Sequence, residues 1–504
     1  MLITSLWSID LLLLFILITF LLYKYVTRHF DYWQKRGVFY LKPIPFFGNA
    51  FRLVSFKTNI GNFFKEIYEG ACQPFFGVFI FDEPYLVLKS PELIKQVLVK
   101  DFSYFMDRLV LAPQHNQILS GMIFFQKSPE WKNNRTKLTP VFTSGKLKNM
   151  FSIIKSIGED MNRYIRKNLG PLEAKEICSK YSTEVIASCA FGIKSNCFES
   201  EDADFRKIGR AMFDFNWRNG VNQAVHWFSQ SWAKAFKVDF FEPWVMDYLN
   251  TAFWDTIKTR GESNVKRNDL VDILINTMNN KELLSENSSE RDKVIGHAIQ
   301  IFAAGFETTS STIAFTLYEL CIHPDMQDKL RNEIITNIKE NNGIITYEGI
   351  QNMNYLDMCV KESLRKYPVL PFLDRRCNKD YQIPGTNVVI ERGMPVLIPM
   401  LGLHYDEKYF PEPDKYDPER FADKNSINVN GLYYVPFGEG PRICIGERFG
   451  LIGTKVGLVH ILSEFVVERT AETPVPIEFA PKSFVLQSKV GIPVKFKEYL
   501  PQAS

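Results

Sequence analysis

Apolar residues recur at helical spacing along most of the chain beyond residue 90, and this pattern predicts a mostly α-helical protein. Segments with one apolar face, separated by turn-forming residues, are typical of amphipathic helices. Such segments fall at residues 91–99, 129–140, 146–168, 172–192, 203–217, 243–260, 269–279, 289–322, 325–341, 347–350 and 355–366. A polar stretch at 279–291 predicts a loop, and short segments at 75–81 and 85–89 predict strands. We therefore expect a mostly α fold with small β-sheets.

The amino-terminal 23 residues differ because they show no polar face. Residues 11–23 are uninterrupted apolar or neutral sequence, and with residues 2–7 they approach the length of a bilayer-spanning helix, about 20 residues. No basic residue precedes the segment and no small-residue cleavage site follows it, which disfavours a removed signal peptide. Basic residues follow it at Lys24, Arg28, Lys35 and Arg36, and they favour a cytosolic position for the rest of the chain. A buried core helix is the alternative, but it would need a polar face.

Residues 24–48 are basic and aromatic and contain Pro43 and Pro45. Proline restricts the backbone, so this segment should hold the following body at a preferred angle to a membrane. We expect residues 1–23 to be an anchor, 24–48 a linker and 49–504 one domain.

The composition excludes several classes of function. The chain has 504 residues, of which 46% are hydrophobic and 23% charged, as in an ordinary globular protein. Its net charge of +3 is too small to indicate nucleic-acid binding. The eight cysteines form no C-x-x-C pair, which disfavours zinc clusters and thioredoxin-like chemistry and favours a reduced, cytosol-facing body.

Residues 437–446 read FGEGPRICIG and place Cys444 in a turn formed by Gly438, Gly440 and Pro441. A metal-binding thiolate must be reachable and held in fixed geometry, and flanking glycines let backbone N–H groups approach the sulfur. Arg442 adds a permanent cation that suits a carboxylate. Most free cysteines are simply buried, but the spacing F-x-x-G-x-R-x-C-x-G favours a thiolate ligand of haem with an arginine at a propionate.

The longest apolar run, residues 289–322, contains the polar sequence AGFETTSST at 304–312. Glycine costs about 1 kcal/mol relative to alanine inside a helix, and an unpaired acid on an apolar helix costs more. For Gly305 or Thr308 alone, a benign kink is the simpler interpretation. An adjacent glycine, acid and hydroxyl instead suggest a ligand notch at Gly305 and proton delivery to oxygen at the iron by Glu307 and Thr308.

Two further pairs of residues could each share a helix face, and Arg420 could join one of them. Glu362 and Arg365 are three residues apart, which by itself indicates only a structural ion pair. Arg420, in the sequence PERF at 418–421, could join them. Trp131 and Arg135, four residues apart, could both bind carboxylates.

Aromatic residues are unusually dense at 212–248, where they either pack a core or meet something apolar, such as a lipid surface or a substrate channel. For the group as a whole, an interfacial lid is as reasonable as a core. The sequence contains neither a complete G-x-G-x-x-G fingerprint nor a G-x-x-x-x-G-K-S/T loop. Reducing electrons must therefore come from another protein.

Taken together, these motifs show that the chain beyond the anchor resembles the cytochrome P450 superfamily of haem-thiolate monooxygenases. The motifs occur in the expected order: W-x-x-x-R (Trp131, Arg135), A-G-x-E-T-T (304–309), E-x-x-R (Glu362, Arg365), P-E-R-F (418–421) and the cysteine loop. Details at 32–38, 374–377 and 438–442 are similar to the microsomal clan of insect detoxification and vertebrate drug-metabolising enzymes.

The resemblance implies a single, mostly helical haem domain with small sheets, carrying haem b (iron protoporphyrin IX). Cys444 would be the iron ligand, and Glu307 and Thr308 would be the catalytic residues that relay protons. Glu362, Arg365 and Arg420 would be structural. The cofactor-binding residues would be Trp131, Arg135, Arg375, Phe437, Arg442 and Cys444.

The resemblance also implies partners and a location. NADPH-cytochrome P450 reductase would supply electrons, with cytochrome b5 as a second donor, at a basic face for which Lys132 and Lys137 are candidates. Lipophilic substrates, either xenobiotics or endogenous lipids and hormones, would lie among residues 105–123, 301–308, 369–372, 484–486 and the aromatic lid. The protein would sit in the endoplasmic reticulum membrane with its catalytic domain facing the cytosol, and nucleic acid would not be a partner.

Two other functions fit a haem-thiolate site. A peroxide-rearranging isomerase or dehydratase would need no reductase, but it has little use for an acid and a hydroxyl at 307 and 308. A haem-binding sensor or carrier would use Cys444 only as a ligand, and substitution of Thr308 would then have no effect.

Overall fold

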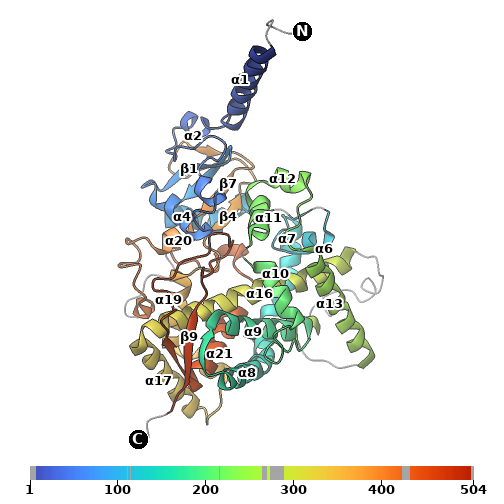
Figure 1. Cartoon of the computed structure of the whole chain (residues 1–504), viewed down its shortest axis with the longest axis vertical. Coiled ribbons are helices and arrows are strands. Elements are labelled where there is room, and N and C mark those ends of the chain that lie inside the picture. The colour runs from blue at the N-terminus through green and yellow to red at the C-terminus, as the bar shows by residue number, and fades with distance from the viewer. Residues whose placement is uncertain are drawn as a thin grey trace.

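Helix α16 (Ser289–Ile322) runs through the middle of the molecule, and other helices pack around it (Figure 1). Its apolar side chains are buried on several faces, including Ile295, Phe302 and Ile313. A helix covered in this way is apolar almost all round, which explains why the sequence pattern identifies 289–322 with the bounds the structure has. Its neighbours include α6 (Gln117–Gly121), α9 (Ala174–Ile186), α19 (Asn354–Lys366) and α21 (Glu447–Glu464).

This computed structural model describes residues 7–500 except 111, 114, 215, 264–268, 273–288 and 423–431. The predicted fold class, mostly α with small sheets, is confirmed. Most of the predicted helix at 269–279 and of the predicted loop at 279–291 lies outside the described residues. The remaining α-helices near predicted segments are α5 (Pro91–Lys95), α7 (Glu130–Leu138), α8 (Ser144–Lys167), α10 (Asp204–Phe213), α13 (Pro243–Ser263), α17 (Pro324–Glu340) and α18 (Tyr347–Gln351).

Several helices were not predicted, most of them because they are short or bury nearly all of their surface. Within α21, eleven consecutive residues from Ile452 to Leu462 are buried, and such a segment lacks the polar face that sequence periodicity detects. The others are α6, introduced above, α2 (Tyr32–Lys35), α3 (Phe51–Val54), α4 (Ile60–Glu69), α11 (Trp217–Phe228), α12 (Gln230–Ala235) and α20 (Met400–His404).

The described residues also form three small sheets. The largest has the order β1-β2-β7-β4 and combines both predicted strands with two later ones. Its strands are β1 (Phe75–Ile80), β2 (Glu83–Leu88), β7 (Pro395–Ile398) and β4 (Leu373–Arg376). In this sheet β1 is antiparallel to β2, β2 is parallel to β7, and Arg375 of β4 pairs with Val396 of β7. The smaller sheets contain β3 (Gly170–Glu173), β9 (Pro493–Glu498) and β8 (Phe465–Arg469), and β5 (Tyr381–Gln382) with β6 (Val389–Ile390).

Helix α1 (Trp7–Val26) projects from one end of the molecule (Figure 1). None of its side chains is buried, and by length and composition it could cross a membrane. The chain that follows packs on the body: Trp33 is fully buried against Gly77 of β1, and Arg28 forms an ion pair with Asp82 at 2.9 Å. The connection between α1 and the body is therefore fixed by packing as well as by proline.

Candidate active site

The loop before α21 holds Cys444 in a turn that requires glycine. Gly438 and Gly440 have φ values of 75° and 74°, a region that disfavours other residues. A Cβ atom at Gly440 would lie 2.0 Å from the carbonyl oxygen of Leu98, so a larger residue cannot fit there. The Cys444 N–H donates to the Phe437 carbonyl at 2.9 Å and closes the turn.

The sulfur of Cys444 lies at one wall of an internal cavity to which the side chain is exposed. Burial within the protein raises the pKa of the thiol, whereas a hydrogen bond from the Gly446 backbone and the nearby guanidinium groups of Arg135 and Arg108 act in the opposite direction. Of the predicted cofactor-binding residues, the structure brings five to this cavity: Trp131, Arg135, Phe437, Arg442 and Cys444.

Helix α16 lines the same cavity with Ala304, Gly305 and Thr308. The Thr308 hydroxyl donates to the carbonyl of Ala304, one turn earlier in the helix, at 2.6 Å, and this hydrogen bond holds the hydroxyl oxygen in place. A Cβ atom at Gly305 would lie 2.4 Å from Cδ1 of Ile186. Gly305 therefore allows α9 to approach α16 closely, in addition to lining the cavity.

Glu307 lines a neighbouring cavity, distinct from the one that holds Cys444. Its carboxylate is buried, pairs with Lys175 at 3.0 Å and accepts hydrogen bonds from Ser311 at 3.0 Å and Gln487 at 2.8 Å. The structure thus brings Thr308 to the cysteine cavity but places the adjacent acid on another face of α16, toward a different cavity. A role of Glu307 in proton delivery stays a prediction.

Buried guanidinium groups gather where α7, β4 and the cysteine loop meet. Burial, together with the charge of Arg108 nearby, lowers the pKa of Arg375 to about 9 and that of Arg442 to about 8. Arg108 reaches Asp374 at 3.6 Å and Arg442 reaches Asp107 at 3.8 Å, both beyond hydrogen-bonding distance. Among the described residues, the Nε atoms of Arg375 and Arg442 have no hydrogen-bond partner.

This cluster fits the two propionates of a haem. Buried cations that repel one another are stabilised by an anionic group, and a guanidinium binds a carboxylate with two parallel hydrogen bonds. Arg442 is also fixed from one side, since its guanidinium lies 4.1 Å from the centre of the Trp131 ring. A cysteine sulfur in the wall of the cavity and buried cations with unsatisfied hydrogen-bond donors beside it are together the groups that haem b requires.

Arg108 is the site residue that sequence reasoning missed. It lines the cavity, and its charge affects Arg135, Arg375 and Arg442. No regular element contains it, so no periodic pattern could place it; its only signal was its position within the predicted pocket segment 105–123.

The remaining walls of the cavity are mainly apolar. They come from the predicted pocket segments at 105–123, 301–308 and 369–372 and from the aromatic lid, through Ile123, Ile301, Val369, Phe372 and Trp227. Phe484, from the fourth predicted segment, contacts this wall but lines a different groove.

The predicted pair of Glu362 and Arg365 lies outside the cavity. Arg420 lies beside this pair, with its Nε atom 3.4 Å from Glu362. The backbone N–H of Asp417 donates to the same carboxylate at 2.9 Å. These contacts tie α19 to the segment that precedes the cysteine loop.

Comparison with known proteins points in the same direction. A family model described as Cytochrome P450 matches residues 40–494. Cytochrome P450 6k1 of Blattella germanica is 40% identical over 501 residues, which cover 96% of each chain. Cytochrome P450 6j1 of the same species is 39% identical over 485 residues, or 95% of each chain. Probable cytochrome P450 6a13 of Drosophila melanogaster is 36% identical over 494 residues, which cover 97% of this chain and 99% of the relative.

Proposed function

The chain belongs to the cytochrome P450 family and is a haem-thiolate monooxygenase with haem b as its cofactor, and from this premise we propose the roles of its residues, its redox partner and its place in the cell. Enzymes of this family insert one oxygen atom from O2 into lipophilic substrates, with electrons from NADPH that arrive through a separate reductase.

We propose that Cys444 is the iron ligand and that Arg442, Arg375, Arg135 and Trp131 hold the propionates. The observation that carries this assignment is the exposure of the Cys444 sulfur to a cavity edged by buried, partly unsatisfied guanidinium groups. When bound, haem b supplies the iron that activates oxygen. The protein's part is to fix the sulfur through the Cys444 to Phe437 backbone hydrogen bond and to neutralise the propionates.

Thr308 is the proposed proton-handling group on the part of the cavity wall that α16 forms. Its hydroxyl already donates to the Ala304 carbonyl, so its oxygen can accept a hydrogen bond from a water or a reacting group in the cavity. Glu307 is proposed to exchange protons with solvent through the neighbouring cavity. For this exchange its carboxylate would have to break its contacts with Lys175 and Gln487.

The proposed electron donor is NADPH-cytochrome P450 reductase, with cytochrome b5 as an additional donor. Lys132 and Lys137 are exposed on α7, while Trp131 on another face of this helix reaches the cavity. Arg448 is exposed at the start of α21, four residues after Cys444. An acidic partner that docks against these cations would approach the haem from the thiolate side.

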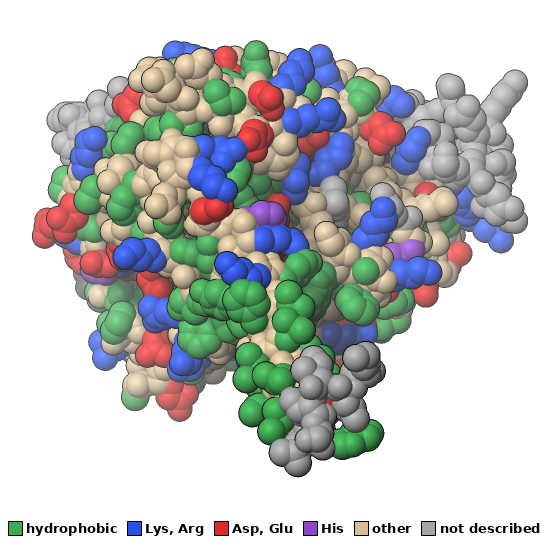
Figure 2. All heavy atoms as spheres, turned by 90° about the horizontal axis from the view of Figure 1, so that it is seen from above, with side chains coloured by type: hydrophobic (Ala, Val, Ile, Leu, Met, Phe, Trp, Pro, Cys, Tyr) green, Lys and Arg blue, Asp and Glu red, His purple; other side chains and the backbone are tan. Residues whose placement is uncertain are grey.

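The proposed location is the endoplasmic reticulum membrane, with residues 1–23 as the anchor, 24–48 as the linker and 49–504 as the cytosolic domain. On the α1 side of the molecule, apolar side chains gather beside lysines and arginines (Figure 2). The aromatic segment contributes Trp217, Trp232 and Phe236, which are 66%, 63% and 72% exposed. Exposed aromatic residues close to an apolar anchor fit a lipid surface.

Reconstitution tests the proposal. The purified protein should convert lipophilic compounds to monooxygenated products when it is mixed with NADPH-cytochrome P450 reductase, NADPH and O2, with products identified by mass spectrometry. Lys132→Glu with Lys137→Glu should lower the turnover rate and raise its dependence on reductase concentration. Unchanged kinetics in that double variant would contradict the proposed docking face.

A further inference from the structure

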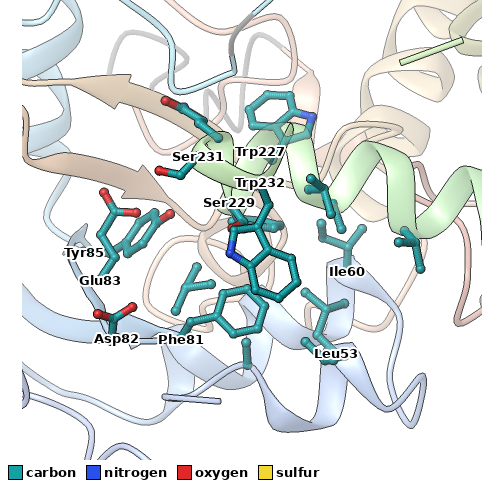
Figure 3. Close-up of a pocket in the computed structure, with 18 of the residues that line it drawn as sticks. Leu53, Ile60, Phe81, Asp82, Glu83, Tyr85, Trp227, Ser229, Ser231 and Trp232 are labelled. Atoms are coloured by element: carbon teal, nitrogen blue, oxygen red, sulfur yellow. The ribbon is translucent and has the colours of Figure 1, made fainter. Parts of the chain in front are cut away.

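Two cavities meet at Trp227, near the end of α11. Its side chain lines the cavity that holds Cys444, and it also lines a separate groove of about 940 Å³. Figure 3 shows this groove, with Trp227 and Trp232 from the α11–α12 region on one side and Leu53 and Phe81 from the amino-terminal elements on the other. Tyr25 and Arg28, at and just beyond the end of α1, line the same groove, so the groove begins where the anchor joins the body.

Aromatic rings form a partition between the two spaces. The Trp227 indole stacks on Phe484 of the groove, with ring centres 5.2 Å apart and an angle of 27°. On the cavity side it meets Phe372 edge to face at 5.1 Å and Phe124 at 6.0 Å. A molecule that passes from the groove to the cavity by this route must displace or slide past the Trp227 ring.

The indole N–H of Trp227 is an unused hydrogen-bond donor. The side chain is 4% exposed, and among the described residues its Nε1 atom has no hydrogen-bond partner. Buried tryptophan usually satisfies this group, because an unmade hydrogen bond there is costly. A water molecule needs two to four polar partners, and the rings packed on Trp227 offer it none.

We propose that Trp227 is a specificity-determining residue whose indole N–H, once a passing substrate shifts the ring from its present packing, donates a hydrogen bond to an acceptor atom of that lipophilic substrate. The acceptor would be a carbonyl or ether oxygen or an aromatic ring nitrogen, carried by an otherwise apolar molecule. A small number of polar groups in a mainly apolar pocket fixes the orientation of a ligand, and the Trp227 ring stands between the groove and the cavity. This inference rests on the proposed monooxygenase function and adds a preferred substrate chemistry.

A matched ligand pair tests the proposal. Fluorene and 9-fluorenone differ by one carbonyl oxygen, and equilibrium dialysis against the haem-loaded protein gives both dissociation constants. Trp227→Phe keeps an aromatic ring and removes the N–H, so it should weaken fluorenone binding about 3- to 10-fold and leave fluorene within about twofold. Trp232→Phe, at the exposed tryptophan of the same groove, should change neither. Equal changes for both ligands in Trp227→Phe, or no change for either, would overturn the proposal.

A measurement on the unaltered protein tests the proposal even if Trp227→Phe does not fold. In ultraviolet resonance Raman spectra, fluorenone should shift one indole N–H band to a hydrogen-bonded position and fluorene should shift none; absence of this difference would also overturn the proposal. The carbon monoxide spectrum of the same samples after reduction distinguishes failure of the proposed function from failure of the role of Trp227. If the unaltered protein lacks the thiolate-haem spectrum, the proposed function fails, whereas a normal spectrum with equal ligand effects removes only the role of Trp227.

Discussion

The Glu362 carboxylate accepts two hydrogen bonds from the Arg365 guanidinium, at 2.7 and 2.8 Å, and both side chains are fully buried. The guanidinium also donates to the backbone carbonyls of His404 and Lys415, so a single ion pair joins α19, α20 and the segment that precedes the cysteine loop. The spacing alone indicated an ion pair of little energetic value, and its burial changes that expectation.

Removal of one partner should therefore unfold the protein more easily. Glu362→Gln leaves the Arg365 charge buried without compensation, which costs about 3–5 kcal/mol in the free energy of unfolding. Urea unfolding of the variant measures the loss. Glu348→Gln is the control, because Glu348 pairs with Lys148 at the surface, and its unfolding midpoint should stay unchanged. A Glu362→Gln protein as stable as the parent would mean that the ion pair has no structural role.

His404 should make the stability depend on pH. Burial lowers the pKa of His404 to about 3. The geometry agrees, because Nδ1 donates to the Arg365 carbonyl and Nε2 accepts from the Val435 N–H, which leaves no place for a second proton. Below pH about 6.5 the unfolded chain takes up a proton that the folded protein refuses, so stability falls as pH decreases from 6.5 toward 3.

The expected size of the His404 effect is about 2 kcal/mol between pH 7 and pH 5, from about 1.4 kcal/mol per pH unit of difference. Urea unfolding at both values, in the parent and in His404→Gln, isolates this contribution. The variant starts less stable but should lose about 2 kcal/mol less between the two pH values. Identical losses in both proteins would show that His404 titrates normally in the fold.

Thr308 should govern the yield of product per NADPH consumed. Thr308→Ala removes the hydroxyl from the cavity wall, so NADPH consumption should continue while product per NADPH falls several-fold. Thr256→Ala is a matched control: the Thr256 hydroxyl also donates to a carbonyl four residues earlier, at 2.9 Å, but it lies on α13 outside the cavity. An unchanged yield in Thr308→Ala would argue against a proton-handling role at this wall.

Deletion of residues 1–23 should weaken membrane attachment without loss of haem, because α1 contributes no buried residue to the fold. Sedimentation with phospholipid vesicles measures attachment, and haem content measures folding. In the truncated protein, Trp232→Ser with Phe236→Ser should reduce the remaining vesicle binding. Ile344→Ser is the control, because Ile344 is similarly exposed and follows α17, a helix at the end of the molecule opposite α1 (Figure 1). Truncated protein without haem would mean that the segment belongs to the core.

The sequence predicted those parts of the site that follow from local spacing. Cys444, Arg442 and Phe437 belong to one turn, and Trp131 and Arg135 to one helix, so the motif brings each set together before any tertiary contact forms. The length of α16 followed from its apolar pattern. Side-chain direction could not be predicted in the same way: Glu307 and Thr308 are adjacent in sequence, yet consecutive residues on a helix point about 100° apart and here line different cavities.

Contacts between segments that are distant in the chain could not be predicted from the sequence either. Arg108 joins the guanidinium cluster only because β4 and the cysteine loop pack against its segment. The partition at Trp227 combines rings from residues 124, 372 and 484, which no spacing relates. The same limit applies to α21, whose nearly complete burial removes the polar face that reveals a helix.

The central claim is the bond between the Cys444 sulfur and the haem iron, and the carbon monoxide difference spectrum of the reduced protein tests it most directly. The parent should show the red-shifted band typical of thiolate-bound haem, and Cys444→Ala should lose it while Cys72→Ala, at an exposed cysteine far along the chain, keeps it. If Cys444→Ala retains the band, or the parent takes up no haem, the iron is not held by this sulfur.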